Sequence, residues 1–238
     1  MTDAGVRYAV YWAPPVSHPL WRAGCEWLGR DAGRPLAALR SVAPHDLTRT
    51  PRRHGFHAAL KAPLRLGDTA RADDFLDAVA NLATRCSPFT MPAMQVAWLG
   101  ELLTLQPATA ITAEHPLRRL ADACVGDLDG WRMMPSASEL ERQQAGSAPD
   151  PARDERVRRW GCAQVFDHWR MHITLSDALP ADRVALRRHL EQQAVAHFAA
   201  SLALPLECDA LCVFVQAAPD TAFVLAHRFH FGEPDTGT

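Results

Sequence analysis

Two short segments, each built around one histidine, constrain the fold of this chain more than any other feature. The first is HGFHAALK (residues 54–61) and the second is WRMHITL (residues 169–175). Side chains of a strand alternate between its two faces, so every second residue lies on the same face. The residues expected on the two shared faces are His57, Ala59 and Lys61 in the first segment, and Arg170, His172 and Thr174 in the second. Each half of the chain therefore presents one histidine and one cation.

The elements that surround the two histidine segments follow the same order in each half: a strand, a helix and a two-stranded hairpin. In the first half these are expected at 54–61, after Asp68, and at 94–99 with 102–105. In the second half they are expected at 165–175, from Pro180 to about 201, and at 210–215 with 222–226. Apolar spacings of three and four indicate the helices, and short apolar runs bounded by turn residues indicate the strands. The repeated order predicts two similar halves.

This order predicts an α+β fold with two pseudo-symmetric α/β lobes, whose antiparallel sheets face a central groove. We expect residues 1–238 to form a single bilobal domain. The approximate lobes are 13–112 and 161–238, with an N-terminal strand at 6–12. A helical and strongly polar connection at 113–160 joins them.

Composition and charge limit the partners of the chain. Its 238 residues carry a formal net charge of −2, so no broad positive field is available to bind a long nucleic acid. No apolar stretch approaches the length of a membrane span. The six cysteines are scattered, and the N-terminus lacks the pattern of a secretory signal. We expect a reduced, cytoplasmic protein that acts on a small phosphorylated molecule; its oligomeric state cannot be read from the sequence.

Two histidines facing one another suit the chemistry of a phosphate ester. A histidine near its ordinary pKa exchanges protons at neutral pH, so one ring can act as general base and the other as general acid. The Thr174 hydroxyl can donate to a phosphoryl oxygen, and Lys61 and Arg170 can stabilise negative charge. This scheme requires neither a cofactor nor a metal ion, and it predicts hydrolysis or ring opening of a small phosphodiester.

The two motifs resemble those of the two-histidine (2H) phosphoesterase superfamily, whose signature is His-x-Thr/Ser-apolar occurring twice. Within it the chain most resembles the branch associated with phosphonate utilisation, on the strand RYAVYW (residues 7–12), on GFHAALKAP (residues 55–63) and on MHITL (residues 171–175). The resemblance implies that His57 and His172 are catalytic and that Thr174 binds phosphate. It also implies cyclic phosphodiesterase activity, with nucleotide or ribose cyclic phosphates as substrate classes.

Two alternative functions stay open at this point. Ala59 stands where the superfamily has Thr or Ser, so one expected phosphate donor is missing. Loss of such a donor commonly costs about 2–4 kcal/mol of transition-state stabilisation, and the chain could be a module that binds a phosphorylated ligand or nucleotide with little catalysis. A zinc site that uses His54 and His168 beside the motif histidines is disfavoured. In a strand, His54 and His57 point to opposite faces, and His168 and His172 lie about 13 Å apart.

Overall fold

The computed structural model describes residues 5–135 and 150–232. The α-helices are α1 (Pro19–Leu28), α2 (Arg49–His54), α3 (Ala72–Thr84), α4 (Pro116–Asp127), α6 (Pro151–Trp160) and α7 (Val184–Leu202). The strands are β1 (Arg7–Trp12), β2 (Ala58–Leu64), β3 (Phe89–Thr90), β4 (Met94–Leu99), β5 (Leu102–Pro107), β6 (Ile173–Thr174), β7 (Glu207–Cys208), β8 (Ala210–Gln216) and β9 (Val224–His230).

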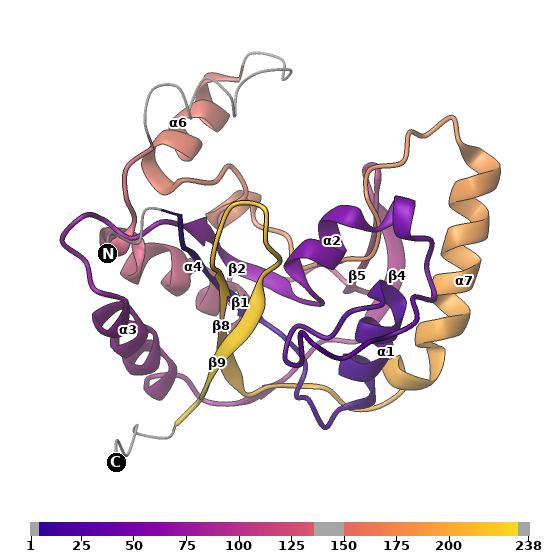
Figure 1. Ribbon diagram of the computed structural model, residues 1–238, viewed down its shortest axis with the longest axis horizontal. Helices are drawn as coiled ribbons and strands as arrows, with labels where there is room; N and C mark the ends of the chain where they lie inside the picture. Colours follow the sequence, from indigo (N-terminus) through magenta and orange to yellow (C-terminus); the bar gives the residue numbers. More distant parts are fainter. Residues whose placement is uncertain (1–4, 136–149, 233–238) are drawn as a thin grey trace.

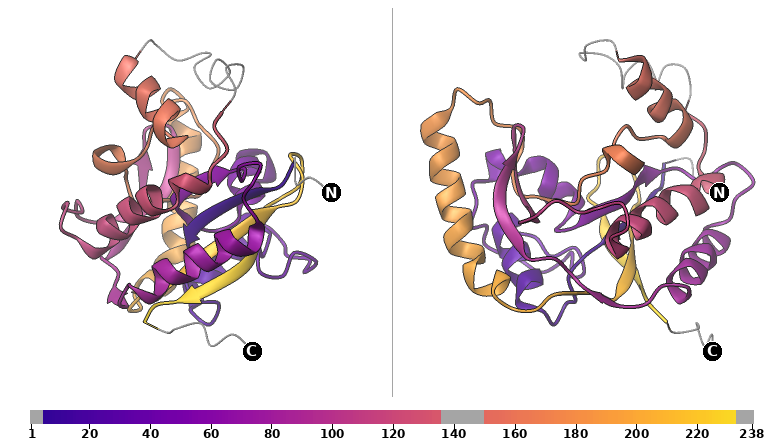
Figure 2. Two further views of the ribbon diagram at one scale, coloured as in Figure 1. Left: turned by 90° about the vertical axis from the view of Figure 1, so that its left-hand side faces the viewer. Right: turned by 180° about the vertical axis from the view of Figure 1, so that it is seen from behind.

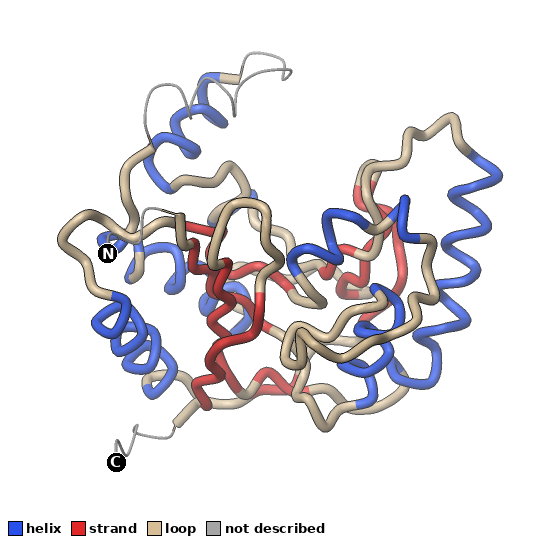
Figure 3. The backbone as a smooth tube through the Cα atoms, in the orientation of Figure 1, coloured by secondary structure: helices blue, strands red, loops and turns tan. Residues whose placement is uncertain are grey.

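Seven strands form one antiparallel sheet in the order β4-β5-β6-β2-β1-β8-β9, and β3 pairs with β7 in a separate two-stranded sheet. Strands run through the middle of the molecule and helices lie outside them (Figure 3). The α+β fold with antiparallel pairing is thus confirmed. The two histidine segments meet in the centre of the seven-stranded sheet, where β6 pairs with β2 through Ile173 and Ala58. This residue pair links strands β4, β5 and β6 of the sheet to strands β2, β1, β8 and β9.

The repeated order of elements is present as β2-α3-β3-β4-β5 and β6-α7-β7-β8-β9. The helices, however, pack on strands of the opposite half: α3 contacts β8 and β9, whereas α7 contacts β4. Figure 1 shows α7 beside β4 and β5 on one side and α3 near β8 and β9 on the other, and the reverse view in Figure 2 agrees. The two halves of the sequence are therefore interleaved in space.

Apolar side chains fill both faces of the sheet unequally. The larger core includes Val10, Leu60 and Ile173, together with apolar residues of α1, α3, α4 and α7. A smaller core on the other face of β1 and β8 includes Tyr11 and Phe214. Alternation along β1 explains the division, because neighbouring residues of a strand point to opposite faces.

The structure differs from the sequence-based expectations in the two histidine segments. The first strand begins at Ala58 rather than at His54, which is the last residue of α2, and the second strand is reduced to Ile173–Thr174. Within the second segment, residues 166–168 form a short 3₁₀ turn. Of the polar connection, 151–160 is helical as α6, and 136–149 lies outside the described residues. Among the described helices, none has the length and apolar character needed to cross a bilayer.

Candidate active site

The first motif histidine is positioned by the two residues that precede it. Gly55 ends α2 with a φ of 86°, a conformation that side chains rarely adopt. Phe56 then packs onto α1 over Gly24, where an added Cβ would lie 2.2 Å from a Phe56 ring carbon. His57 follows, and its Nδ1 lies 2.9 Å from the Gly55 carbonyl oxygen. The sequence HGFH thus encodes a tight turn that fixes the imidazole before β2 begins.

The second motif histidine is held in the same way. Its Nδ1 lies 2.8 Å from the Arg170 carbonyl oxygen, again two residues earlier. Trp169 is buried beside it and donates its indole N–H to the Ala59 carbonyl oxygen at 2.9 Å. This bond ties the second histidine segment directly to β2. A carbonyl oxygen only accepts, so Nδ1 is the protonated nitrogen in both histidines and the unprotonated Nε2 is the one left for chemistry.

The register between β2 and β6 brings the predicted residues together. Ala58 pairs with Ile173 in antiparallel register, and continuing that register by one residue in each direction sets His57 opposite Thr174 and Ala59 opposite His172. His172 lies near enough to His57 to contribute to the lowering of its pKa. His57, His172 and Thr174 are partly exposed and Ala59 is exposed. We call this side of the sheet the histidine face.

Tyr11 is the part of the site that sequence reasoning missed. Its ring stacks on that of His57 with centroids 3.7 Å apart and an interplanar angle of 20°. Tyr11 is 1% exposed and pairs with Ala59 across β1 and β2. Burial raises the pKa of its phenol well above the ordinary value. A signal was available: Arg7, Ala9 and Tyr11 alternate onto one face of the first strand.

His54 lies against this stack. Its Nδ1 is 3.2 Å from the Tyr11 hydroxyl, and its ring centroid is 6.0 Å from that of His57 and 4.8 Å from that of Phe223. The expectation that His54 and His57 point to opposite faces of a strand is wrong, because Gly55 turns the chain between them. In the described part of the chain, no cluster of three or more His, Cys, Asp or Glu side chains is arranged to hold a metal ion.

The electrostatic environment keeps all three histidines neutral near pH 7. Burial is the main cause that lowers the pKa of His57 to about 3; the hydrogen bond to Gly55 opposes this shift, and the nearby His54 and His172 contribute to it. Burial, with the charges of Arg7, Arg53 and Arg30, lowers the pKa of His54 to about 4. Burial also lowers the pKa of His172. A neutral imidazole accepts protons, and a bound anion favours its charged form.

Lys61 does not lie on the histidine face, contrary to the sequence-based expectation. Tyr11 pairs with Ala59 but Val10 pairs with Lys61, so Leu60 is an extra residue and β2 bulges there. The bulge turns Lys61 to the opposite face, where it is 3% exposed. Its Nζ donates to the Val125 carbonyl oxygen and to the Asp129 carboxylate, each at 3.1 Å.

Arg170 lies beside β4 and β5. Its Nη1 donates to the Asp167 and Trp169 carbonyl oxygens at 2.9 Å. It lines a pocket of about 520 Å³ together with Gln95 and Gln106. Because residues 169–172 are not in a strand, strict alternation with His172 does not apply to Arg170. Thr174, in contrast, is in β6 and pairs with Thr104.

The chain matches one protein family and curated relatives over most of its length. The family model described as "Protein of unknown function (DUF1045)" matches residues 59–224, beginning two residues after His57. Curated relatives named ribose 1,5-bisphosphate phosphokinase PhnN include one from Laribacter hongkongensis (strain HLHK9), 33% identical over 225 residues and 92% of this chain. Another, from Janthinobacterium sp. (strain Marseille), is 30% identical over 242 residues and 97% of this chain. The chain spans about half the length of these relatives, 50% and 52% respectively.

Similar solved structures include a phosphoesterase (14% identity, TM-score 0.41) and E. coli LigT complexed with 3'-AMP (15% identity, TM-score 0.39). Each alignment covers 96% of this chain and 99% of the other. In this structure, the two motif histidines directly precede β2 and β6, which pair through Ala58 and Ile173. By its match over 59–224, the chain belongs to the DUF1045 family.

Proposed function

We propose that this protein hydrolyses or opens a small, cyclic phosphodiester, with His57 and His172 as the acid–base pair. The observation that carries the proposal is the matched presentation of the two rings. Each is fixed through Nδ1 by the carbonyl oxygen two residues earlier, and both belong to adjoining segments of one sheet. A phosphodiester lying between them can exchange one proton with each ring.

The proton balance of the reaction is simple. One imidazole removes a proton from water as its oxygen attacks phosphorus, the bond from phosphorus to the leaving oxygen breaks, and the second imidazole protonates that oxygen. A phosphomonoester and a hydroxyl result. We assign the base to His57, whose lowered pKa keeps the ring neutral, and so able to accept a proton, near pH 7. His172, helped by the bound anion, is suited to the acid. Thr174, opposite His57, can donate its hydroxyl to a phosphoryl oxygen.

A cyclic phosphate on ribose is the substrate that we favour within this class. The relatives that match 92% and 97% of this chain are named for chemistry on ribose 1,5-bisphosphate. Opening a 1,2-cyclic phosphate of ribose 5-phosphate at its O2 side leaves that same compound. A phosphodiesterase and a kinase of these specificities could therefore act in succession. Nucleoside 2′,3′-cyclic phosphates carry the same five-membered ring and are the comparison substrates.

The test is a hydrolysis assay on ribose cyclic phosphates and 2′,3′-cyclic nucleotides, with EDTA present. We expect turnover in the unmodified protein and a loss of about 10²–10⁴-fold in kcat for both His57→Ala and His172→Ala. His168→Ala is the matched control, because His168 is exposed and lies four residues before His172. Turnover that survives in either motif variant, or that EDTA abolishes, would contradict the metal-independent two-histidine mechanism.

A second candidate function rests on Ala59. This residue is exposed directly opposite His172, at the place where the superfamily signature has a hydroxyl. Without that donor, the same face could hold a phosphorylated ligand or nucleotide and turn it over slowly or not at all. Calorimetric binding of cyclic phosphates without any turnover would favour this binding module over the enzyme.

A further inference from the structure

Arg7 and Arg53 lie at one edge of the histidine face without a carboxylate partner. Arg7 begins β1, and Arg53 is on α2 directly before His54. Within the described residues, neither guanidinium is within ion-pair distance of an Asp or Glu. The charges that act on Arg7 are those of Arg53, Tyr11 and Arg65, and they include no Asp or Glu.

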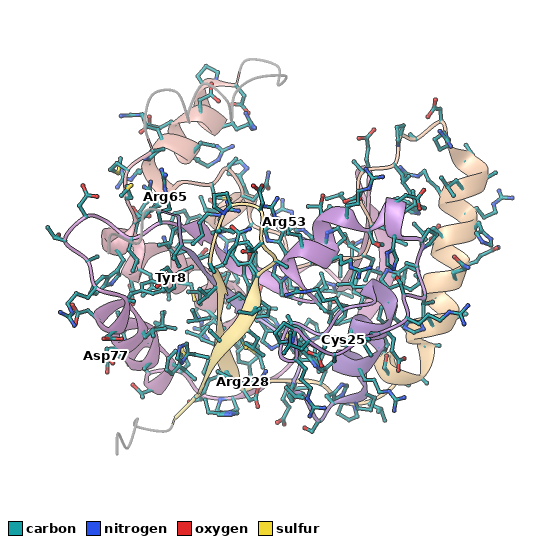
Figure 4. All side chains as sticks on the ribbon, in the orientation of Figure 1. Tyr8, Cys25, Arg53, Arg65, Asp77 and Arg228 are labelled. Carbon is teal, nitrogen blue, oxygen red and sulfur yellow. The ribbon has the colours of Figure 1, made fainter. Side chains whose placement is uncertain are left out.

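Both guanidiniums are held in place through Nε, Arg7 by the last residue of β8 and Arg53 by the turn that joins β8 to β9. Arg7 Nε donates to Gln216 Oε1 at 2.6 Å, and Arg53 Nε lies 3.4 Å from the Thr221 carbonyl oxygen. Gln216 in turn donates to that same carbonyl oxygen at 2.7 Å. In Figure 4 Arg53 lies beside this turn, with Arg65 on the same upper side of the molecule. Because each side chain is bonded through Nε, the terminal Nη atoms of each guanidinium can donate to another group.

Aromatic rings lie between Arg7 and the motif histidine His57. The Arg7 guanidinium carbon is 5.5 Å from the centre of the Phe223 ring, which stacks on His54, and the Tyr11 hydroxyl contacts His54. His54 experiences the charges of Arg7 and Arg53. Two fixed, partly desolvated cations beside neutral rings repel one another, and a bound anion would relieve that repulsion.

The geometry points to Arg7 and Arg53 as a subsite for a second, non-reacting phosphate group of the substrate. Arginine forks bind phosphate oxygens through paired N–H donors. The inference rests on the proposed function and narrows it: the preferred substrate is a cyclic phosphodiester that also carries a phosphomonoester, rather than an unphosphorylated cyclic nucleotide. The subsite would position the ring so that its cyclic phosphate meets His57 and His172.

The experiment compares ribose 1,2-cyclic phosphate with and without a 5-phosphate. We expect the unmodified protein to prefer the 5-phosphorylated compound by at least about tenfold in kcat/KM, because charge-assisted hydrogen bonds are the strong ones. Arg7→Met/Arg53→Met should reduce this preference to near unity, and Arg53→Met alone should reduce it in part. Arg52→Met, the neighbouring arginine on α2 that contacts His45, should retain the preference. Urea unfolding of each variant checks that it is folded, and Arg53→Met serves if the double variant is not.

A binding measurement separates this inference from the proposed function. The same two compounds are titrated calorimetrically into His172→Ala, with and without the Arg7 and Arg53 substitutions. A Kd ratio of at least about tenfold that the substitutions abolish supports the subsite even if no substrate is turned over. Equal affinities for the two compounds, or an equal loss for both in the double variant, would overturn it.

Discussion

His57 and His172 hold their Nδ1 atoms 2.9 and 2.8 Å from the carbonyl oxygen of the residue two places earlier. The two rings therefore share a tautomer although their surroundings differ. His57 is stacked on Tyr11 and its pKa is lowered to about 3, whereas the pKa of His172 is lowered by burial alone. The two imidazoles thus share one hydrogen-bonding geometry but differ in their surroundings.

The pH dependence of catalysis should reflect these lowered values. A pair that works as one neutral and one protonated ring is populated in the free enzyme between its two pKa values, here from about 3 to below the ordinary 6.5. We expect kcat/KM to be bell-shaped with an optimum below pH 6.5. The optimum of kcat should lie higher, because bound phosphate raises the pKa of the acid. Steady-state rates from pH 4 to 9 measure both profiles. A kcat/KM that rises steadily to pH 8 would contradict this assignment.

Restoring a hydroxyl at position 59 should increase the rate. Ala59→Thr adds a donor opposite His172, and one donor of this kind is worth about 10²–10³ in kcat when it is well placed. We expect a smaller increase in kcat, of at least about tenfold, because the residues around position 59 are not optimised to orient a hydroxyl there. Ala59→Val has the same shape without the hydroxyl and should give no increase. Equal rates for the two variants would mean that a donor here does not limit turnover.

Tyr11 should act through its ring more than through its hydroxyl. Tyr11→Phe keeps the stack on His57 and loses the contact with His54, so kcat should change by only a few-fold. Tyr11→Ala removes a buried ring, which should lower the free energy of unfolding by about 3–5 kcal/mol and release His57 from its orientation. Chemical denaturation and kcat are measured for both. A Tyr11→Phe loss as large as that of His57→Ala would instead assign the hydroxyl a direct role.

Lys61 should matter for stability and not for substrate binding. Lys61→Met leaves the Asp129 carboxylate with Arg132 as its remaining partner and should lower the free energy of unfolding by about 1–3 kcal/mol. The KM for a cyclic phosphate should stay within about twofold, since Lys61 lies on the opposite face from the histidines. A large rise in KM at unchanged stability would contradict this placement.

Acid should destabilise the protein through its neutral histidines. The pKa values of His54 and His57 are lowered from 6.5 to about 4 and about 3, so below pH 6.5 the unfolded chain binds protons that the folded protein does not. Their contribution to stability is complete above pH 6.5 and falls as the pH drops toward 4. We expect a loss of about 2 kcal/mol per histidine between pH 7.5 and 5. Urea unfolding of His57→Gln should show a shallower pH slope, and that of exposed His168→Gln should not.

The two histidines could be recognised in the sequence because each motif orients its own imidazole, through the carbonyl oxygen two residues earlier. This local arrangement does not depend on the length of the strand that follows. Prediction from the sequence failed for Lys61 because a one-residue bulge at Leu60 reverses the face of the residue that follows. It failed for His54 because Gly55 ends a helix where a strand was expected. Tyr11 was missed because its contact with His57 depends on which strand pairs with β2. Pairing between distant strands is a property of the tertiary structure rather than of any one segment.

The packing of α3 and α7 on strands of the opposite half has a consequence for folding. Because α3 rests on β8 and β9 and α7 on β4, neither half can bury its apolar surface before the other is in place. The two imidazoles come from different halves and meet only where β2 and β6 pair. An intermediate with one half ordered would lack a partner histidine, so the proposed acid–base pair would be complete only once β2 and β6 have paired.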